Sequence, residues 1–333
     1  MTVNNLASLH ELCDRILSLE QFLIVSHYNP DTDAYGSSLG LGLGLRALGK
    51  GVSFINESGV LPRYRFLPSI AEVRTVLPAQ KYDGVIACDC GDEKRMGDTL
   101  KEQLKKHSLL INIDHHRSNN NFGTHNWVEA EASSASEMVF MLLEEMARRT
   151  QRSPFTREVA TCLLAGIIGD TGSFRYSTTG EGTFSVAAKL VAYGAEPSSI
   201  GEALYGTRRL SAVRLQAHAL CSLEISHDGR LAQVVLSAQT MATYAATSDD
   251  TEDLVERMRD IEGVEVAIFL REEDGYWKVS MRTKKVGHDL SLMAQAFGGG
   301  GHQAASGFRW RGGLSDLRIK LALEVDKLLL PRG

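Results

Sequence analysis

The sequence predicts an α/β protein whose N-terminal domain is built on a parallel sheet and whose smaller C-terminal domain is also α/β. Apolar runs of strand length alternate with helical segments in the first half of the chain, which is typical of a parallel sheet. The later segments form a series of strands with hairpin signals. The length of 333 residues suits two domains better than one core.

The N-terminal segment predicts a helix followed by a buried strand. Leucine and isoleucine recur at helical spacing over residues 5–19, and the short apolar run "QFLIVS" follows. Two more buried strands are predicted at "GVIACD" (84–89) and "SLLINID" (108–114). The charged stretch "EKRMGDTLKEQLKK" between them predicts a solvated helix.

The run "SSLGLGLGLRALG" (37–49) fits two patterns, because its leucines alternate as in a strand and also share one helix face. We interpret it as a helix whose glycines allow close packing. Residues 133–149 predict an amphipathic helix that starts with a capping box formed by Ser134 and Glu137. The segment "EVATCLLAGIIGDTGSF" predicts a buried helix or strand that ends at Asp170.

A change of pattern between residues 194 and 222 predicts the domain boundary. Glycine and proline are followed there by a polar helical segment, which indicates a linker. We therefore expect a first domain over 1–193, a helical linker over 194–222 and a second domain over 223–333. Its predicted elements are the strand "RLAQVVLS", a hairpin turning at "EDG" in "VEVAIFLREEDGYWKVSMRT", the strand "GFRWRG" and a closing amphipathic helix, "LSDLRIKLALEVDKLLL".

Composition and charge exclude several classes of protein. A net charge of −5 and a pI near 6.1 argue against a protein that coats long nucleic acid, but leave room for a short phosphorylated ligand in one basic pocket. The five cysteines are scattered and form no CxxC pair, which argues against a disulfide framework or a zinc knuckle. The N-terminal residues show no signal-peptide pattern, and no apolar run reaches the roughly 18 residues of a membrane helix, so a cytoplasmic location is expected.

Four polar clusters each follow a predicted buried element. Because the carboxyl ends of parallel strands line one crevice, we expect clusters far apart in sequence to converge there. The residues are His27, Asp31 and Asp33 in the first cluster, Asp89 in the second, Asp114, His115 and His116 in the third, and Asp170 in the fourth.

These side chains favour a metal centre over the simpler interpretations. Taken singly, "PDTD" fits a solvated turn, Asp89 and Asp170 fit helix N-caps, and the two histidines fit a surface pair. Their joint occurrence after four successive elements favours metal binding. Carboxylate and imidazole ligands suit Mn²⁺, with Mg²⁺, Co²⁺ or Zn²⁺ as substitutes, and two ions would neutralise so many acids and activate a water at phosphorus.

The motifs "HYNPDTDAYGS", "DCGD", "DHH" and "GDTGSF", in this order, resemble the DHH phosphoesterase superfamily. The later "FGGGGHQAASGF" (297–308) resembles the glycine-rich signature of the DHH-associated substrate-binding domain. The match spans about residues 20 to 310 and most resembles the nanoRNase type. That resemblance implies hydrolysis of short oligoribonucleotides to mononucleotides and of pAp (3′-phosphoadenosine 5′-phosphate) to AMP, in a cleft between the domains.

The resemblance also implies a role for each residue of the clusters. His27 and Asp31 would hold one Mn²⁺, Asp33, His115 and Asp170 the other, and Asp89 would bridge the two. His116 would face the scissile phosphate, and Asp114 would orient the imidazoles by hydrogen bonding. Thr32 departs from the family, which often has glycine between the two acids.

The substrate-binding residues are expected mainly in the second domain. Glycines 298–301 followed by His302 and a helix-compatible "QAAS" would offer backbone N–H groups and a helix N-terminus to phosphate, although a glycine run is more often a simple loop. The basic stretch with Lys278, Arg282, Lys284 and Lys285 predicts a phosphate patch, or else an edge strand protected by lysines. The expected substrate contacts are Arg282, Gly299, Gly300, Gly301, His302 and Arg117, with Arg95 as a weaker candidate.

Other functions remain open from the sequence. A cyclic or linear dinucleotide phosphodiesterase, acting on c-di-AMP or c-di-GMP, would use the same metals and glycine motif. A manganese pyrophosphatase would need a different C-terminal signature, and a processive single-strand exonuclease would need more basic surface. A catalytically silent nucleotide-binding regulator would have lost metal ligands, and none is lost. The expected partners are short RNA or dinucleotides and pAp, with no long duplex and no membrane; a homodimer is expected from the resemblance alone.

Overall fold

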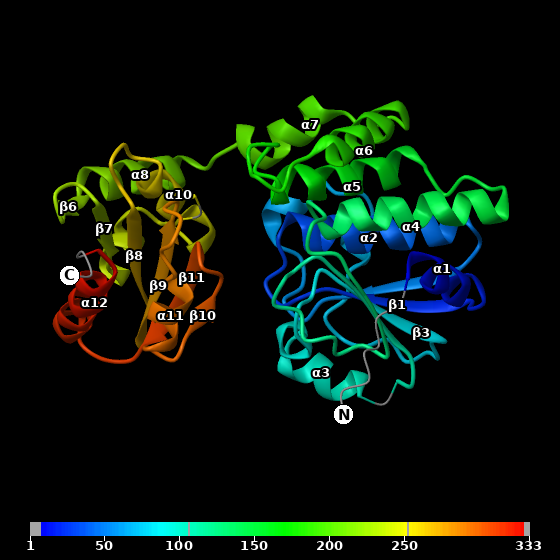
Figure 1. The fold of residues 1–333 in the computed structure, drawn as a ribbon, viewed down its shortest axis with the longest axis horizontal. Helices are drawn as coiled ribbons and strands as arrows, with labels where there is room; N and C mark the ends of the chain where they lie inside the picture. The colour runs from blue at the N-terminus through cyan, green and yellow to red at the C-terminus, as the bar shows by residue number, and fades with distance from the viewer. Residues whose placement is uncertain (1–7, 106, 252, 330–333) are drawn as a thin grey trace. The chain divides into compact units, whose positions relative to one another are not determined.

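The computed structural model describes residues 8–105, 107–251 and 253–329. The chain divides into two compact units, the first ending at Thr207 and the second beginning at Arg208 (Figure 1). Residues 194–222 carry the short helix α7 (Pro197–Gly201), a π-helix (Glu202–Gly206) and α8 (Leu210–Cys221). Their assignment as a linker stays a prediction. Residues 5–7 of the predicted first helix lie outside the described residues.

The first unit contains a five-stranded parallel sheet in the order β2-β1-β3-β4-β5, which confirms the predicted parallel sheet. The chain places β2 on one side of β1 and β3 on the other, so strand order reverses between β1 and β3. Such a reversal leaves a crevice at the carboxyl ends of the two strands, where open α/β sheets bind their ligands. The strands are β1 (Gln21–Val25), β2 (Gly51–Ile55), β3 (Gly84–Cys88), β4 (Leu110–Asp114) and β5 (His125–Val128).

Two of these strands, β2 and β5, were not predicted from the sequence. Both lie at the sheet edges, where β2 is half-buried over its first three residues and β5 is only four residues long. The predicted charged helix also divides, because Gly97 adopts φ +103° between a 3₁₀ turn (Glu93–Met96) and α3. The helices of this unit are α1 (Leu9–Leu17), α2 (Thr32–Ala47), α3 (Asp98–Leu104), α4 (Ala135–Thr150), α5 (Arg157–Asp170) and α6 (Glu181–Ala192).

The glycine-rich segment forms helix α2, as predicted, and it packs closely against α5 and α4. A Cβ at Gly36 would lie 2.6 Å from the carbonyl oxygen of Cys162 in α5. A Cβ at Gly44 would lie 2.7 Å from the Leu143 side chain in α4. The helix is therefore buried on nearly all sides, which is why small and apolar residues dominate its sequence.

The second unit contains a six-stranded mixed sheet in the order β10-β11-β9-β8-β7-β6, in which only β7 and β8 pair in parallel among the described residues. The predicted hairpin at "EDG" is confirmed as β8 and β9. Helices α11 and α12 pack on one face of the sheet, and α8 and α10 pack on the other over β7 and β8. The elements are β6 (Glu224–Ser226), β7 (Leu231–Leu236), α9 (Ala238–Thr243), α10 (Leu254–Arg259), β8 (Val266–Glu273), β9 (Tyr276–Thr283), α11 (Leu290–Gln295), β10 (Gly300–Gly301), β11 (Ala305–Trp310) and α12 (Leu314–Leu329).

One sequence-based expectation in this unit is wrong. The "QAAS" segment does not begin a helix, because Ala305 and Ser306 start strand β11, which pairs with Gly300 and Gly301 of β10. The glycine motif is therefore a tight β-hairpin beside β9. The dipole of a following helix cannot contribute to phosphate binding there.

Within the described ranges, no helix has both the length and the apolar character needed to cross a membrane.

Replacing Gly36 by Ala tests the packing of α2. The new Cβ would meet backbone atoms of α5 at 2.6 to 2.9 Å, so we expect the free energy of unfolding to fall by about 1–3 kcal/mol in denaturant titrations. Gly201→Ala is the matched control, since nothing lies within 4 Å of its Cβ position. Equal stability of the two variants would contradict the packing argument.

Candidate metal centre

The four polar clusters predicted from the sequence start from the ends of three strands and one helix. His27 follows β1 by two residues, Asp89 directly follows β3, and Asp114 ends β4 with His115 and His116 behind it. Asp170 is the last residue of helix α5, so the buried element predicted there as a helix or a strand is a helix. The N-terminus of α2 adds Asp31 as its N-cap and Asp33 in its first turn.

His27 and Asp31 lie on one side of Asp89. The His27 Nδ1 atom lies 2.9 Å from the Tyr28 carbonyl oxygen, a contact that favours the proton on Nδ1. Its Nε2 atom then faces the acids, 3.6 Å from Asp89 Oδ2 and 3.9 Å from Asp31 Oδ1. Asp31 Oδ1 accepts from the backbone N–H groups of Asp33 and Ala34, which fixes its orientation.

Asp33, His115 and Asp170 lie on the other side. The His115 Nε2 atom lies 3.5 Å from Asp170 Oδ2, 3.9 Å from Asp33 Oδ2 and 3.5 Å from Asp89 Oδ1. Its Nδ1 atom lies 3.3 Å from the Ala132 carbonyl oxygen. Both oxygens of Asp33 accept backbone hydrogen bonds, at 2.7 and 2.9 Å, from Ala135 and Ser136 in the first turn of α4.

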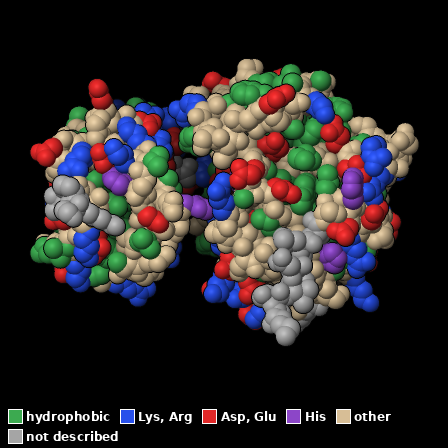
Figure 2. Space-filling view, in the orientation of Figure 1, with side chains coloured by type: hydrophobic (Ala, Val, Ile, Leu, Met, Phe, Trp, Pro, Cys, Tyr) green, Lys and Arg blue, Asp and Glu red, His purple; other side chains and the backbone are tan. Residues whose placement is uncertain are grey.

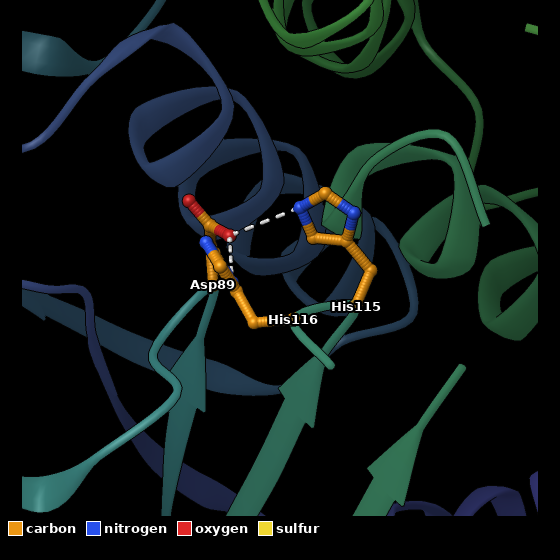
Figure 3. A group of neighbouring side chains, drawn as sticks. All are labelled: Asp89, His115 and His116. Carbon is orange, nitrogen blue, oxygen red and sulfur yellow. Dashed lines mark ion pairs between the residues drawn. The ribbon is translucent and has the colours of Figure 1, made fainter. Parts of the chain in front are cut away.

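Asp89 stands between the two groups, with Oδ2 toward His27 and Oδ1 toward His115. Figure 3 shows its carboxylate at the end of β3, facing the His115 ring on the adjoining segment. Its backbone is in the left-handed region, at φ +53°. Asp89 Oδ1 and His27 Nε2 are buried and make no hydrogen bond within the part of the chain that the structure describes.

This donor set fits two cations that share Asp89. The candidate ligand atoms lie within 4.8 Å of one another in two groups, His27 with Asp31 and Asp89, and Asp33 with His115 and Asp170. Asp89, His115 and His116 form a third such group. Buried polar atoms without hydrogen bonds are rare and call for an explanation, and a bound cation would supply it.

The charges of this cluster depend strongly on one another. Burial opposes protonation of His27 and His115, but the neighbouring carboxylates prevail and raise their pKa values to about 10 and about 11. Burial, with the nearby Asp89, raises the pKa of Asp33 to about 7, and burial raises that of Asp170 well above its usual value. Burial also opposes ionisation of Asp89, yet His115 and His27 hold its pKa well below the usual range. When no cation is bound, the protons on the two histidines offset the negative charge of the carboxylates.

His116 is positioned by a buried polar network. Its Nδ1 atom lies 2.7 Å from Asp114 Oδ1, and Asp114 Oδ2 accepts from Asn119 at 2.5 Å. Asn119 in turn donates to Asn112 Oδ1, and Asn112 donates to the Cys90 carbonyl oxygen. Asp114 was expected to orient both imidazoles, but the contact of His115 Nδ1 is with the Ala132 carbonyl instead.

The sequence reasoning missed several members of this site. Asn112, Asn119 and the backbone groups of Ala132, Ala135 and Ser136 all hold site residues in place. Asn112 lies within an apolar strand, and a buried asparagine in such a run was the one available signal. The backbone N–H and carbonyl groups are common to all residue types, so the sequence does not reveal which of them hold the site.

Of the predicted substrate contacts, Arg117 and Arg95 belong to the first unit, and Arg282, Gly299, Gly300, Gly301 and His302 belong to the second. Arg117 is exposed and pairs with Glu131 at 2.7 Å, and Arg282 Nε donates to Glu256 Oε1 at 2.8 Å. Gly299 packs against Gly307 and Phe308, and the His302 carbonyl accepts from the Ser306 hydroxyl. Arg95 contributes its carbonyl oxygen, which accepts from the Tyr28 N–H. The role of each in binding substrate stays a prediction.

Basic and acidic side chains are interspersed on the faces visible in Figure 2. The net charge of −5 agrees with this mixture, which forms no large single-sign field for a long polyanion on the described surface in view.

Two family models match the chain. The "DHH family, N-terminal domain" matches residues 21–167, and the "DHHA1 domain" matches residues 233–325. The first covers all the clusters up to His116 and ends three residues before Asp170, and the second covers the glycine hairpin and strands β8, β9 and β11.

Curated relatives and a solved structure match nearly the whole chain. The bifunctional oligoribonuclease and PAP phosphatase NrnA of Bacillus subtilis (strain 168) is 31% identical over 299 residues, which are 89% of this chain and 91% of that protein. NrnA of Thermus thermophilus is 32% identical over 314 residues, 93% of this chain and 90% of that protein. The crystal structure of an exopolyphosphatase-related protein from Bacteroides fragilis superposes with a TM-score of 0.89 at 26% identity, over 95% of this chain and 96% of that one.

Binding of Mn²⁺ should release protons, and its affinity should rise with pH. The raised pKa values of about 10 and 11 mean that His27 and His115 carry protons at pH 7, and a cation requires the neutral imidazole. Calorimetric titration in two buffers of different ionisation enthalpy measures this release directly. His10→Ala, at an exposed histidine outside the cluster, is the control. Identical heats in both buffers would contradict this charge arrangement.

Proposed function

This chain belongs to the DHH family, and from that premise we propose that it is a two-metal phosphodiesterase that hydrolyses short oligoribonucleotides to mononucleotides and pAp to AMP. The single observation that carries the proposal is the position of Asp89 between two sets of ligand atoms, with one oxygen toward each histidine. Membership of the family makes the chain a phosphoesterase. The substrates and the metal are the proposed part.

We propose Mn²⁺ as the metal, with Mg²⁺, Co²⁺ or Zn²⁺ as substitutes, because the ligands are carboxylates and imidazoles without thiolate. His27 and Asp31 would hold one ion, and Asp33, His115 and Asp170 the other, with Asp89 shared. Two bound ions supply an activated water and stabilise the attacking and leaving oxygens of an in-line displacement at phosphorus.

The chain's own groups would orient these ligands and transfer a proton. Asp33 is held by the amides of α4, and His115 by the Ala132 carbonyl, so both can face the site without rearrangement. Asp114 would fix the orientation of the His116 ring, because its carboxylate lies against Nδ1. We propose that His116 donates a proton to the leaving oxygen, while Asp114 positions it.

In this proposal the second unit binds the nucleotide through Arg282, the glycine hairpin (Gly299, Gly300 and Gly301) and His302. The NrnA relatives support the substrate class, because both are described as acting on oligoribonucleotides and PAP and match over about nine tenths of their own length. The substrate panel described next would also identify a cyclic dinucleotide phosphodiesterase or a catalytically silent regulator.

A substrate panel with Asp89→Ala as the inactive variant tests the proposal. With Mn²⁺, the wild type should hydrolyse a linear dinucleotide and pAp faster than a cyclic dinucleotide or pyrophosphate, as followed by chromatography of the products. Asp89→Ala should lose on the order of a thousandfold in kcat with unchanged circular dichroism, since both ligand sets depend on this carboxylate. Asp14→Ala, at an exposed acid on α1, is the matched control. Turnover of the dinucleotide by Asp89→Ala at the wild-type rate would refute the assignment.

Replacing the two adjacent histidines separately should give different defects. His115→Ala removes a proposed ligand, so metal analysis should show less bound Mn²⁺. His116→Ala should keep the metal and lower kcat by roughly 10²–10⁴-fold, the usual contribution of a positioned proton donor. Equal metal loss in both variants would show that His116 is a ligand instead.

A further inference from the structure

One half of the sheet in the second unit has an open face. Helices α8 and α10 cover this face over β7 and β8, with Leu215, Leu254 and Phe269 in the shared core. On β9 and β11 the same face carries side chains that are exposed or half-buried: Lys278, Ser280, Arg282, Ala305, Gly307 and Arg309. The opposite face of these strands is buried under α11 and α12.

A row of cations crosses this face. Arg271, Lys278 and Arg309 are direct partners in the pairing of β8 with β9 and of β9 with β11, so the three side chains project from the same side. Like charges in directly opposed positions destabilise a sheet. Protection of a sheet edge does not explain Lys278, because β9 has β8 on one side and β11 on the other. Arg309 lies beyond the two residues of β11 that pair with β10.

The protein neutralises only one member of this row by an ion pair among the described residues. Arg271 is buried and pairs with Glu273, which also accepts from the Tyr276 hydroxyl. Lys278 makes no ion pair or hydrogen bond within the described ranges, and the Arg309 guanidinium lies over the Tyr276 ring, 5.2 Å from its centroid. Partial loss of hydration at the sheet surface lowers the pKa of Lys278, and the nearby Arg271 lowers it further, while Glu273 opposes the shift.

We propose that Lys278 and Arg309 form a subsite for a second, non-scissile phosphate of the substrate. The inference rests on the proposed function and adds a binding group to it. An ammonium and a planar guanidinium on adjacent strands can both donate to one terminal phosphate, and such charge-assisted bonds are strong. The anion would remove the repulsion between the two cations.

The positions next to this pair carry only small side chains. The next pair of opposed residues on this face is Ser280 of β9 and Gly307 of β11, and neither carries a large side chain. Arg282 follows on the same face, four residues from Lys278 and so about 13 Å along β9. The two basic positions are therefore separate contacts on one short substrate. Arg282 is already paired with Glu256, whereas Lys278 has no acid at ion-pair distance among the described residues.

The double variant Lys278→Gln/Arg309→Gln of the full chain tests the subsite. The substrates are a dinucleotide with a 5′-phosphate, one with a 3′-phosphate and one with neither. For one of the phosphorylated dinucleotides, KM should rise about tenfold or more with kcat retained, the effect of losing one charge-assisted hydrogen bond. The dinucleotide without a terminal phosphate should be unaffected. Lys327→Gln, on helix α12 at the opposite face, is the matched control.

Binding titrations with the same three dinucleotides separate this inference from the proposed function. If the wild type hydrolyses none of them, the proposed function fails, and the titrations still decide the subsite. The slope of log affinity against log salt should fall by roughly 0.7 for each phosphate contact that the variant loses. An equal loss for all three dinucleotides, or no loss for any, overturns the inference.

Discussion

The packing of helix α2 against α5 and α4 is the constraint on which the candidate metal centre depends. The start of α2 carries Asp31 and Asp33, the end of α5 carries Asp170, and the start of α4 supplies the amides that bind Asp33. Gly166 of α5 lies so close that an added Cβ would be 2.8 Å from Asp33 Oδ1. Glycines at these contacts let three helices meet at the carboxyl ends of β1 and β3.

The electrostatic design of the centre follows from that convergence. Several carboxylates are forced into a small, largely buried volume, where like charges strongly perturb one another. The two histidines lie between them and share Asp89. The fold thus creates an excess of negative charge that only protons or cations can balance. The stability of the fold and the metal affinity proposed for the site arise from the same helix packing.

Much of this arrangement could be predicted from the sequence, since strongly apolar runs identified β1, β3 and β4 and the polar residues after them. The edge strands β2 and β5 could not, because half-exposed or four-residue strands have little hydrophobic pattern. The helix that ends at Asp170 could not be told from a strand, because the two look alike in a short apolar run. The hairpin at Gly300 and Gly301 was mistaken for a helix start because pairing partners lie outside any local window. For the same reason, the sequence alone does not show that Lys278 lies opposite Arg309, because that pairing depends on the register of β9 and β11.

Asp33 accepts hydrogen bonds from helix α4 in addition to its proposed role as a metal ligand, and this affects how related sequences can be compared. Its carboxylate binds the first amides of α4, so a chain that no longer needed a metal would still need Asp33 to hold that helix. The side-chain oxygen Asp89 Oδ1 has no such hydrogen bond among the described residues. Retention of Asp33 therefore says little about activity in a relative. Under the proposed bridging role, the presence or loss of Asp89 would distinguish a working hydrolase from a descendant that has kept only the scaffold.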